Sequence, residues 1–167
     1  MKVTLRENQD ADIFRLQEIE RAAAELFRDS DLIDIDTMAV IPMADHIASI
    51  ETGTSISAEI DGRLAGFVMG EMHGPVAYLR ELDVDPAYQR RGIGAMLVTA
   101  YIKAARAKNA EAIYLSTFRD PPWNAPFYRR MGFTDVDRAD YLPWMTAMEA
   151  AQANFLDLST RVFMRMG

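Results

Sequence analysis

A glycine-rich turn between an apolar strand and an amphipathic helix is the segment whose residues point most clearly to chemistry. It runs from Val84 to Gly94 with the sequence VDPAYQRRGIG. A ligand can approach the backbone closely at glycines, and the first amides of a helix have no intrahelical acceptor. Such a helix start binds phosphate through those amides and through the positive end of the helix dipole. Arg90 and Arg91 add positive charge there.

The sequence does not match two other phosphate-binding motifs. A dinucleotide-binding fingerprint needs glycine or alanine three residues after Gly94, where the chain has Leu97. A P-loop needs a Gly-Lys-Ser/Thr sequence, which the chain lacks. A lone Gly-Ile-Gly would fit a capped helix with a solvated basic turn equally well, but the complete run QRRGIG between a strand and a helix is more specific.

The run Gln89–Gly94 resembles the Gln/Arg-x-x-Gly-x-Gly/Ala motif of the GNAT superfamily of acetyl-CoA-dependent N-acetyltransferases. Phe127–Phe133, with the sequence FYRRMGF, is similar to that family's tyrosine on a short helix followed by Gly-Phe. The resemblance is strong over residues 55–137 and looser elsewhere. It implies that the amides from Arg91 to Ala95 hold the CoA pyrophosphate and that the edge of strand Leu82–Val84 pairs with the pantetheine arm. The implied cofactor-binding residues are Leu82, Asp83, Val84, Gln89, Arg90, Arg91, Gly92, Ile93, Gly94, Ala95 and Asn124.

The chemistry of acetyl transfer to an amine sets three requirements. The amine must be neutral, the oxyanion must be stabilised, and the departing thiolate must be protonated. The chain has no cysteine, and its sequence has neither a Ser-His-Asp set nor a Gly-x-Ser-x-Gly elbow. We therefore expect direct attack within a ternary complex rather than an acyl-enzyme.

Tyr128 is the predicted general acid. A phenol titrates at about 10 and a thiol at about 8.5, so a tyrosine can protonate a thiolate and still be neutral at pH 7. An aromatic side chain that merely packs a short helix onto the sheet is the structural alternative. The following Arg-Arg-Met-Gly-Phe and the match to the family's tyrosine favour the catalytic role.

Glu81 is the predicted general base. A carboxylate in the middle of a central strand is costly to bury unless it is paired or used in catalysis, and burial would make it a better proton acceptor. A salt bridge is the alternative role. Regular alternation along the strand predicts two faces, with Leu79, Glu81 and Asp83 on one and Tyr78, Arg80, Leu82 and Val84 on the other.

Asn124 departs from the family's pattern. Many relatives have an asparagine about seven residues before the tyrosine, where it binds the pantetheine arm, but Pro121 occupies that position here. Asn124 lies only four residues before Tyr128, with Pro126 between them. A helix N-cap role for Asn124 is the alternative, and it does not exclude contact with the ligand.

The resemblance implies that Phe27, Trp123 and Tyr141 bind the acceptor, beside the acidic segment 29–36. In the family the acceptor lies between the first helices, the central strands and the C-terminal hairpin. The acidic segment could attract a cationic amine or be a solvated surface. The helix expected within 140–155 could line the site or form a homodimer interface.

The pattern of elements predicts one α/β domain over residues 1–167. Strands are expected at 2–6, 55–60, 64–71, 76–84, 112–117, 133–136 and 160–166, and helices between about 10 and 27 and at 42–50, 92–107 and 143–155, with a short one around 127–131. The Asp61-Gly62 dipeptide between two apolar runs predicts a tight hairpin. Together with the resemblance, this order implies a GNAT-like mixed, mostly antiparallel sheet of six to seven strands with helices on both faces.

Composition narrows the possible partners. The chain has 18 Lys and Arg against 25 Asp and Glu, a net charge of −7, which argues against broad binding to nucleic acid or anionic membrane. With no cysteine and only two histidines, we expect no metal site. The N-terminal sequence MKVTLRENQD lacks the features of a signal peptide, so we expect a cytoplasmic protein.

Three functions remain open at this point. The leading one is an N-acetyltransferase with acetyl-CoA as co-substrate and a small-molecule or peptide amine as acceptor. The second is a non-catalytic acyl-CoA-binding sensor on the same scaffold. The third is an interaction domain whose glycine turn only caps a helix.

Overall fold

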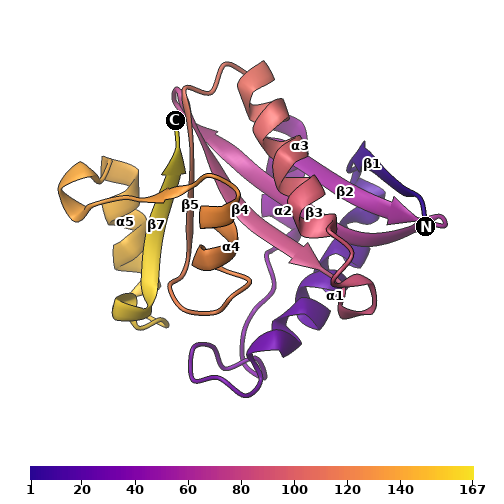
Figure 1. Cartoon of the computed structure of the whole chain (residues 1–167), viewed down its shortest axis with the longest axis horizontal. Coiled ribbons are helices and arrows are strands. Elements are labelled where there is room, and N and C mark those ends of the chain that lie inside the picture. Colours follow the sequence, from indigo (N-terminus) through magenta and orange to yellow (C-terminus); the bar gives the residue numbers. More distant parts are fainter.

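The computed structural model describes residues 1–167 and contains one seven-stranded sheet (Figure 1). The strand order is β1-β2-β3-β4-β5-β7-β6, and only β4 and β5 run parallel. This confirms the predicted mixed, mostly antiparallel sheet. The strands are β1 (Val3–Glu7), β2 (Thr54–Ile60), β3 (Arg63–His73), β4 (Val76–Val84), β5 (Ala112–Phe118), β6 (Thr134–Asp135) and β7 (Arg161–Met166).

Five α-helices cover the two faces of the sheet, as predicted. The α3 and α4 helices lie on one face, and α1, α2 and α5 lie on the other. Two helices end earlier than their apolar patterns indicated: the residues after α1 continue as a 3₁₀ turn over Ala24–Phe27, and α5 ends at Gln152. The helices are α1 (Ile13–Ala23), α2 (Met43–Thr52), α3 (Ile93–Ala107), α4 (Ala125–Arg130) and α5 (Pro143–Gln152).

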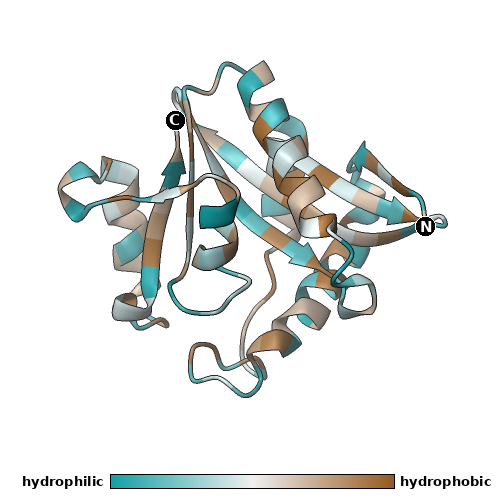
Figure 2. Cartoon of the chain, in the orientation of Figure 1, coloured by the Kyte–Doolittle hydropathy of each residue, from teal (hydrophilic) through white to brown (hydrophobic).

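The largest core lies between the sheet and α3. Leu97, Val98 and Tyr101 of α3 are almost completely buried against alternate residues of the central strands. Figure 2 shows hydrophobic residues recurring along these strands and along α3. The apolar period of α3 therefore fixes that helix, and with it the glycine-rich turn at its N-terminus, against the middle of the sheet.

The predicted hairpin between β2 and β3 is confirmed. Asp61 and Gly62 have φ angles of 50° and 75°, the left-handed conformation that a two-residue hairpin turn requires. Ile60 pairs with Arg63 directly across this turn.

The predicted faces of β4 are wrong, because the strand contains a β-bulge. Leu79 lies opposite Gly70 and Glu81 lies opposite Met69, so Arg80 is an extra residue without a partner in the ladder. Leu79 and Leu82 consequently both pack toward the α3 core. Glu81 and Asp83 alternate with Leu82 and so face the other side of the sheet.

Gly70 makes room for this bulge. A Cβ atom there would overlap both the Tyr101 hydroxyl and the Tyr78 carbonyl oxygen. The Tyr101 hydroxyl donates a hydrogen bond of 3.0 Å to that carbonyl. The Tyr78 carbonyl, which lies beside the bulge in β4, thus accepts a hydrogen bond from a side chain of α3.

The bulge coincides with an opening between β4 and β5. Their parallel pairing joins Val76–Leu79 to Ala112–Leu115 and goes no further. Both strands continue, β4 to Val84 and β5 to Phe118, so this edge of β4 has no strand partner beyond Leu79. None of the helices has the length and hydropathy that crossing a membrane would require.

Candidate active site

The glycine-rich turn places a row of free amides at the N-terminal end of α3. None of the six amides from Arg90 to Ala95 donates a hydrogen bond within the chain, and the next one, of Met96, bonds to the Gly92 carbonyl at 3.1 Å. Arg90 and Gly92 have φ angles of 62° and 75°, which turn the backbone into this conformation. A row of free amides at a helix start suits a phosphate group.

The basic side chains of this turn are also free of carboxylates. Arg90 and Arg91 are exposed and take part in no ion pair, while Arg91 lies over the Tyr88 ring at 5.7 Å from its centroid. Gln89 is half-buried, and its side-chain amide donates to the Val84 carbonyl at 3.4 Å. The turn therefore has positive charge available for an anion.

Glu81 and Asp83, the acids of β4, lie close enough together that each affects the pKa of the other. Burial raises the pKa of Asp83 well above its usual range, and the Glu81 charge raises it further. Burial also raises the pKa of Glu81, although its interaction with Asp83 opposes this. Both carboxyls therefore hold a proton more readily than an exposed acid does. The Asp83 Oδ2 atom is buried without a partner in the chain.

Tyr128 lies in α4, where only 7% of its surface is exposed. Its ring packs edge-on against Phe127 and Phe133, at centroid distances of 5.1 and 5.8 Å. Burial raises the pKa of its phenol strongly, and the negative charges of Glu81 and Asp83 raise it further. Its hydroxyl makes no hydrogen bond within the chain. The phenol is consequently neutral at pH 7, with a proton to donate.

A third buried carboxyl, Glu20 of α1, was not anticipated from the sequence. It is 7% exposed, and its Oε1 atom accepts a hydrogen bond of 2.9 Å from the Ile41 amide. Burial raises its pKa to about 7, with the charge of Glu81 as the next cause. The signal that could have found it is its position beside Leu16 and Ile19 on the apolar face of the helix.

Arg161, the first residue of β7, was also missed. Its guanidinium donates to the Ser116 hydroxyl at 3.0 Å and lies 4.4 Å from the Phe118 ring centroid. Burial lowers its pKa, and its charge in turn lowers the pKa of Glu81 and of Tyr128. Its Nε atom is buried without a partner in the chain. No motif in the sequence singled out this arginine.

Asn124 occupies the N-cap position of α4, but its side chain makes no capping hydrogen bond. Its Oδ1 atom is buried and has no partner in the chain. The cap is made by the backbone alone, with the Asn124 carbonyl accepting from the Tyr128 amide at 3.1 Å. The side-chain amide oxygen is therefore left without a hydrogen-bond donor from the chain.

The predicted acceptor residues divide into two groups. Phe27 lies against Trp123 and Phe118, at centroid distances of 5.7 and 5.5 Å. Tyr141 instead packs against Phe163, at 5.1 Å, in the cluster beneath α5. The structure thus brings Phe27 and Trp123 together and places Tyr141 in a separate aromatic cluster.

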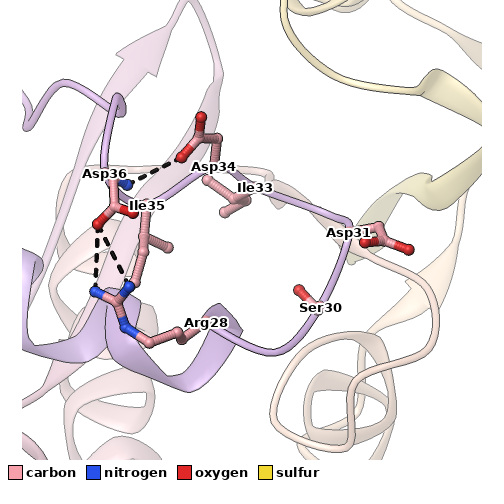
Figure 3. A pocket seen from close by; sticks show the side chains of 7 residues that line it. All are labelled: Arg28, Ser30, Asp31, Ile33, Asp34, Ile35 and Asp36. Carbon is pink, nitrogen blue, oxygen red and sulfur yellow. Dashed lines mark hydrogen bonds and ion pairs between the residues drawn. The ribbon is translucent and has the colours of Figure 1, made fainter.

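The acidic segment after α1 surrounds a hollow of about 340 Å³. Arg28 bonds to Asp36 across it at 3.4 Å and to Glu25 on its own turn. Figure 3 shows Arg28 and Asp36 on one side of the loop and Asp31 apart from them on the other. The residues that line the hollow are Arg28, Ser30, Asp31, Ile33, Asp34, Ile35 and Asp36.

Comparison with known proteins supports the resemblance drawn from the two motifs. The family model described as the acetyltransferase (GNAT) family matches residues 15–133. The [ribosomal protein bS18]-alanine N-acetyltransferase of Salmonella typhimurium is 28% identical over 100 residues, which cover 59% of this chain and 68% of that protein. The mycothiol acetyltransferase of Clavibacter michiganensis is 35% identical over 84 residues, or 48% of this chain, but the match spans only 26% of that longer protein.

Solved structures show the same fold. The PaiA N-acetyltransferase of Thermoplasma acidophilum, solved in complex with coenzyme A, superposes with a TM-score of 0.75 at 17% identity and covers 99% of this chain and 98% of its own. The ribosomal-protein-S18-alanine N-acetyltransferase of Escherichia coli gives a TM-score of 0.70 at 16% identity, covering 99% and 93%. Because the family model matches well over half of the sequence, and the fold agrees, the chain belongs to the acetyltransferase (GNAT) family of enzymes.

Proposed function

We propose that the chain transfers an acetyl group from acetyl-CoA to a primary amine by direct attack within a ternary complex. The observation that carries this proposal is the row of six free amides at the start of α3, beside the unpaired edge of β4. A phosphate-binding helix start next to a free strand edge suits a ligand that has a diphosphate and an extended amide-containing arm.

The free amides of α3 and the unpaired edge of β4 suggest which residues bind acetyl-CoA. The amides from Arg91 to Ala95 hold the diphosphate, and Gln89, Arg90 and Arg91 form the surrounding turn. The backbone of Leu82–Val84 pairs with the pantetheine arm, and the buried Oδ1 atom of Asn124 accepts from one of its amides. The support for these roles is that the amides of the turn and the Asn124 oxygen lack partners in the chain, and that this edge of β4 has no neighbouring strand beyond Leu79.

Two side chains move protons in the proposed reaction. The neutral amine nitrogen attacks the thioester carbonyl carbon, and the carbon–sulfur bond then breaks. Glu81 takes the proton that the amine loses, directly or through a water molecule, and Tyr128 gives its proton to the departing sulfur. The raised pKa of Glu81 suits a proton acceptor, and the buried neutral phenol of Tyr128 suits a donor.

The acceptor binds beside Phe27 and Trp123 in this proposal, with the acidic segment 29–36 attracting its positive charge before deprotonation. Trp123 is 41% exposed and so is available for contact. Two of the similar proteins are named for acetylating an alanine of a ribosomal protein, which suggests a peptide amine as the first acceptor to try, with small amines beside it. The support for Tyr141 in this role is weaker, since it packs under α5.

The test has two stages. Calorimetry with acetyl-CoA measures binding, and the absence of heat at millimolar concentration would leave only an interaction domain. Release of free CoA thiol is then measured across a panel of peptide and small-molecule amines. Amine-dependent thiol release supports the enzyme, whereas tight binding without release with any amine would favour the acyl-CoA sensor. It remains a prediction that residues 1–167 form a single domain. A homodimer and a cytoplasmic location also remain predictions.

A further inference from the structure

Arg161, at the start of β7, carries a charge that the chain leaves without a counter-charge. A guanidinium has five N–H donors, and the chain offers this one a single acceptor, the Ser116 hydroxyl, at 3.0 Å. The Nε atom is buried without a partner, and Arg161 belongs to none of the ion pairs of the structure. A half-buried cation whose only acceptor is a neutral hydroxyl is costly to keep. This arrangement suits a negatively charged ligand.

The neighbours of Arg161 hold its guanidinium in place without neutralising it. The guanidinium carbon lies 4.4 Å from the centroid of the Phe118 ring, a favourable contact for a cation. Ser116 also accepts from the Gln152 side chain, at 3.4 Å, so its hydroxyl is fixed by two donors. A guanidinium positioned in this way has N–H groups left over, and a carboxylate is the anion whose two oxygens match that planar fork.

Arg161 lies on the same side of the sheet as Glu81. Along β7, Val162 belongs to the α3 core and Phe163 to the cluster beneath α5, so Arg161 projects to the α5 side. Its partner in the register of β5 is Phe118. Glu81 faces the same side from β4, away from the α3 core. Figure 1 shows β4 and β5 diverging, with β7 beyond β5. Glu81 and Arg161 therefore lie on the two sides of the opening between β4 and β5.

A row of aromatic rings connects Arg161 to the surface. Phe118, which contacts the guanidinium, lies 5.5 Å from Phe27, and Phe27 lies 5.7 Å from Trp123, between ring centroids. Exposure rises along this row, from 4% for Phe118 to 41% for Trp123. Phe27 and Trp123 are the rings that the proposed function assigns to the acceptor. An acceptor bound against them therefore lies beside Arg161.

We propose that Arg161 binds a carboxylate of the acceptor, so that the enzyme prefers amines that also carry a carboxylate. This inference rests on the proposed function, whose acceptor it narrows to free amino acids and to peptides with an acidic first residue. The carboxylate is held on the β7 side of the opening, and the amine points toward Glu81 on the β4 side. In a chain with a net charge of −7, an unpaired guanidinium supplies the local attraction that an anionic group requires.

The alternative role for Arg161 is that of a counter-charge to Glu81. Its charge lowers the pKa of Glu81, although the two side chains form no ion pair. The two roles predict different kinetics. Loss of a counter-charge would affect transfer to every amine alike and move the pH profile. Loss of a carboxylate-binding residue would raise the KM of carboxylate-bearing amines alone.

The kinetic test uses amines in pairs that differ by one carboxylate. Free L-amino acids are compared with their amides, and the amidated tripeptide Glu-Ala-Ala is compared with amidated Gln-Ala-Ala. We expect wild-type kcat/KM to be at least about 10-fold higher for the carboxylate-bearing member of a pair. A preference among the free amino acids would identify the bound group as the main-chain carboxylate, and a preference between the tripeptides as an acidic side chain.

The variants are Arg161→Gln and Arg161→Lys, with Arg165→Gln as the matched control. Arg165 lies on the same strand, and its guanidinium is 5.7 Å from the centroid of the Tyr114 ring, but it is exposed. We expect Arg161→Gln to raise the KM of the carboxylate-bearing amine by at least about 10-fold and to leave kcat/KM for its neutral counterpart within a few-fold. Arg161→Lys keeps the charge without the fork and should give an intermediate KM. Arg165→Gln should keep the wild-type preference.

A second measurement needs no acetyl transfer. Protein loaded with CoA, which has no acetyl group to give, is titrated by calorimetry with the same pairs of amines. We expect the carboxylate-bearing amines to bind to the wild type and to lose this binding in Arg161→Gln, but not in Arg165→Gln. The comparison between paired amines in the wild type stands even if Arg161→Gln does not fold.

The outcomes separate the inference from the proposed function. An enzyme that transfers acetyl groups equally well to both members of every pair would overturn the inference alone. An Arg161→Gln variant that loses activity equally with all amines, with a moved pH profile, would show a counter-charge to Glu81 and would also overturn the inference. Carboxylate-dependent binding to the CoA-loaded protein, without transfer to any amine, would support the carboxylate site and overturn the proposed function. Neither transfer nor such binding would overturn both.

Discussion

Glu81 and Asp83 lie on the side of β4 opposite the α3 core, where burial raises the pKa of both carboxyls. Two residues on the same face of a strand are normally separated by one side chain that points the other way, and here that is Leu82. The bulge at Arg80 sets this face, because it reverses the alternation just before Glu81. The bulge therefore decides on which side of the sheet the two acids lie.

Replacement of Glu81 by Gln should remove the acidic limb of the pH–rate profile and lower turnover by about 100-fold, as expected for loss of a general base. We expect wild-type activity to fall on the acid side as Glu81 becomes protonated, whereas glutamine has no such equilibrium. Steady-state kinetics across the acid and neutral pH range check this. Glu71→Gln on the neighbouring strand is the control, and a limb that persisted in Glu81→Gln would assign the base elsewhere.

Replacement of Tyr128 by Phe should lower turnover by at least ~10-fold and leave the affinity for acetyl-CoA within a few-fold. The ring packing against Phe127 and Phe133 is retained, so only the proton donor is lost. Turnover and calorimetry measure the two effects. Tyr114→Phe is a matched control, since Tyr114 is equally buried on the α5 side. Equal turnover in the wild type and Tyr128→Phe would remove the phenol from the mechanism.

Replacement of Gly92 by Val should abolish binding of acetyl-CoA while the domain stays folded. Gly92 has a φ of 75°, so a β-branched residue would turn the backbone away from the conformation that aligns the amides.

The hairpin residue Gly62 provides the control for Gly92. It has the same φ of 75°, and in both positions an added Cβ meets nothing within 4 Å. Gly62→Val should therefore lose a similar amount of stability and keep acetyl-CoA binding. Thermal unfolding and calorimetry compare the pair, and normal binding by Gly92→Val would refute the role of the turn.

The stability of Glu20→Gln relative to the wild type should depend on pH. Burial raises the folded-state pKa of Glu20 from the ordinary 4.5 to about 7, so the protonated carboxyl fits the fold and the ionised one is penalised. The contribution of the Glu20 carboxyl to the free energy of unfolding is fully present below about pH 4.5 and is lost as the pH rises through 7.

Glu20→Gln should consequently gain on the order of 2–3 kcal/mol relative to the wild type as the pH rises from about 4.5 to about 8. Urea unfolding at a series of pH values measures this difference. A difference that stayed constant across the range would mean that Glu20 has an ordinary pKa in the folded protein.

Replacement of Trp123 or Phe27 by Ala should raise the KM for the amine several-fold and leave the KM for acetyl-CoA unchanged. The two rings contact each other, so the double variant should cost less than the sum of the single ones. Phe155→Ala is the control, because that ring is 74% exposed and lies outside this cluster. An unchanged amine KM would move the acceptor site away from these rings.

Local patterns in the sequence predicted the parts of the fold that depend on neighbouring residues. Asp61 and Gly62 adopt the positive φ angles that their hairpin requires. The apolar period of α3 and the glycines before it predicted a helix that starts with free amides, and Ile93–Ala107 begins in this way. Such features require no knowledge of distant partners.

The arrangement of the acids depends on contacts between distant segments, and so could not be read from alternation. The bulge in β4 arises where Gly70 of β3 admits the Tyr101 hydroxyl of α3. A glycine inside a predicted strand is a known sign of a bulge or of a close backbone approach, and Gly70 was that sign. The contact of Glu20 with Ile41 is likewise made only once the segment after α1 has folded back.

The measurement that tests the central claim most directly is a crystal structure of the protein with acetyl-CoA. The account predicts diphosphate oxygens within about 3.2 Å of amides between Arg91 and Ala95, and the acetyl group in the opening between β4 and β5 near Tyr128. Acetyl-CoA bound elsewhere, with these amides still free, would contradict it.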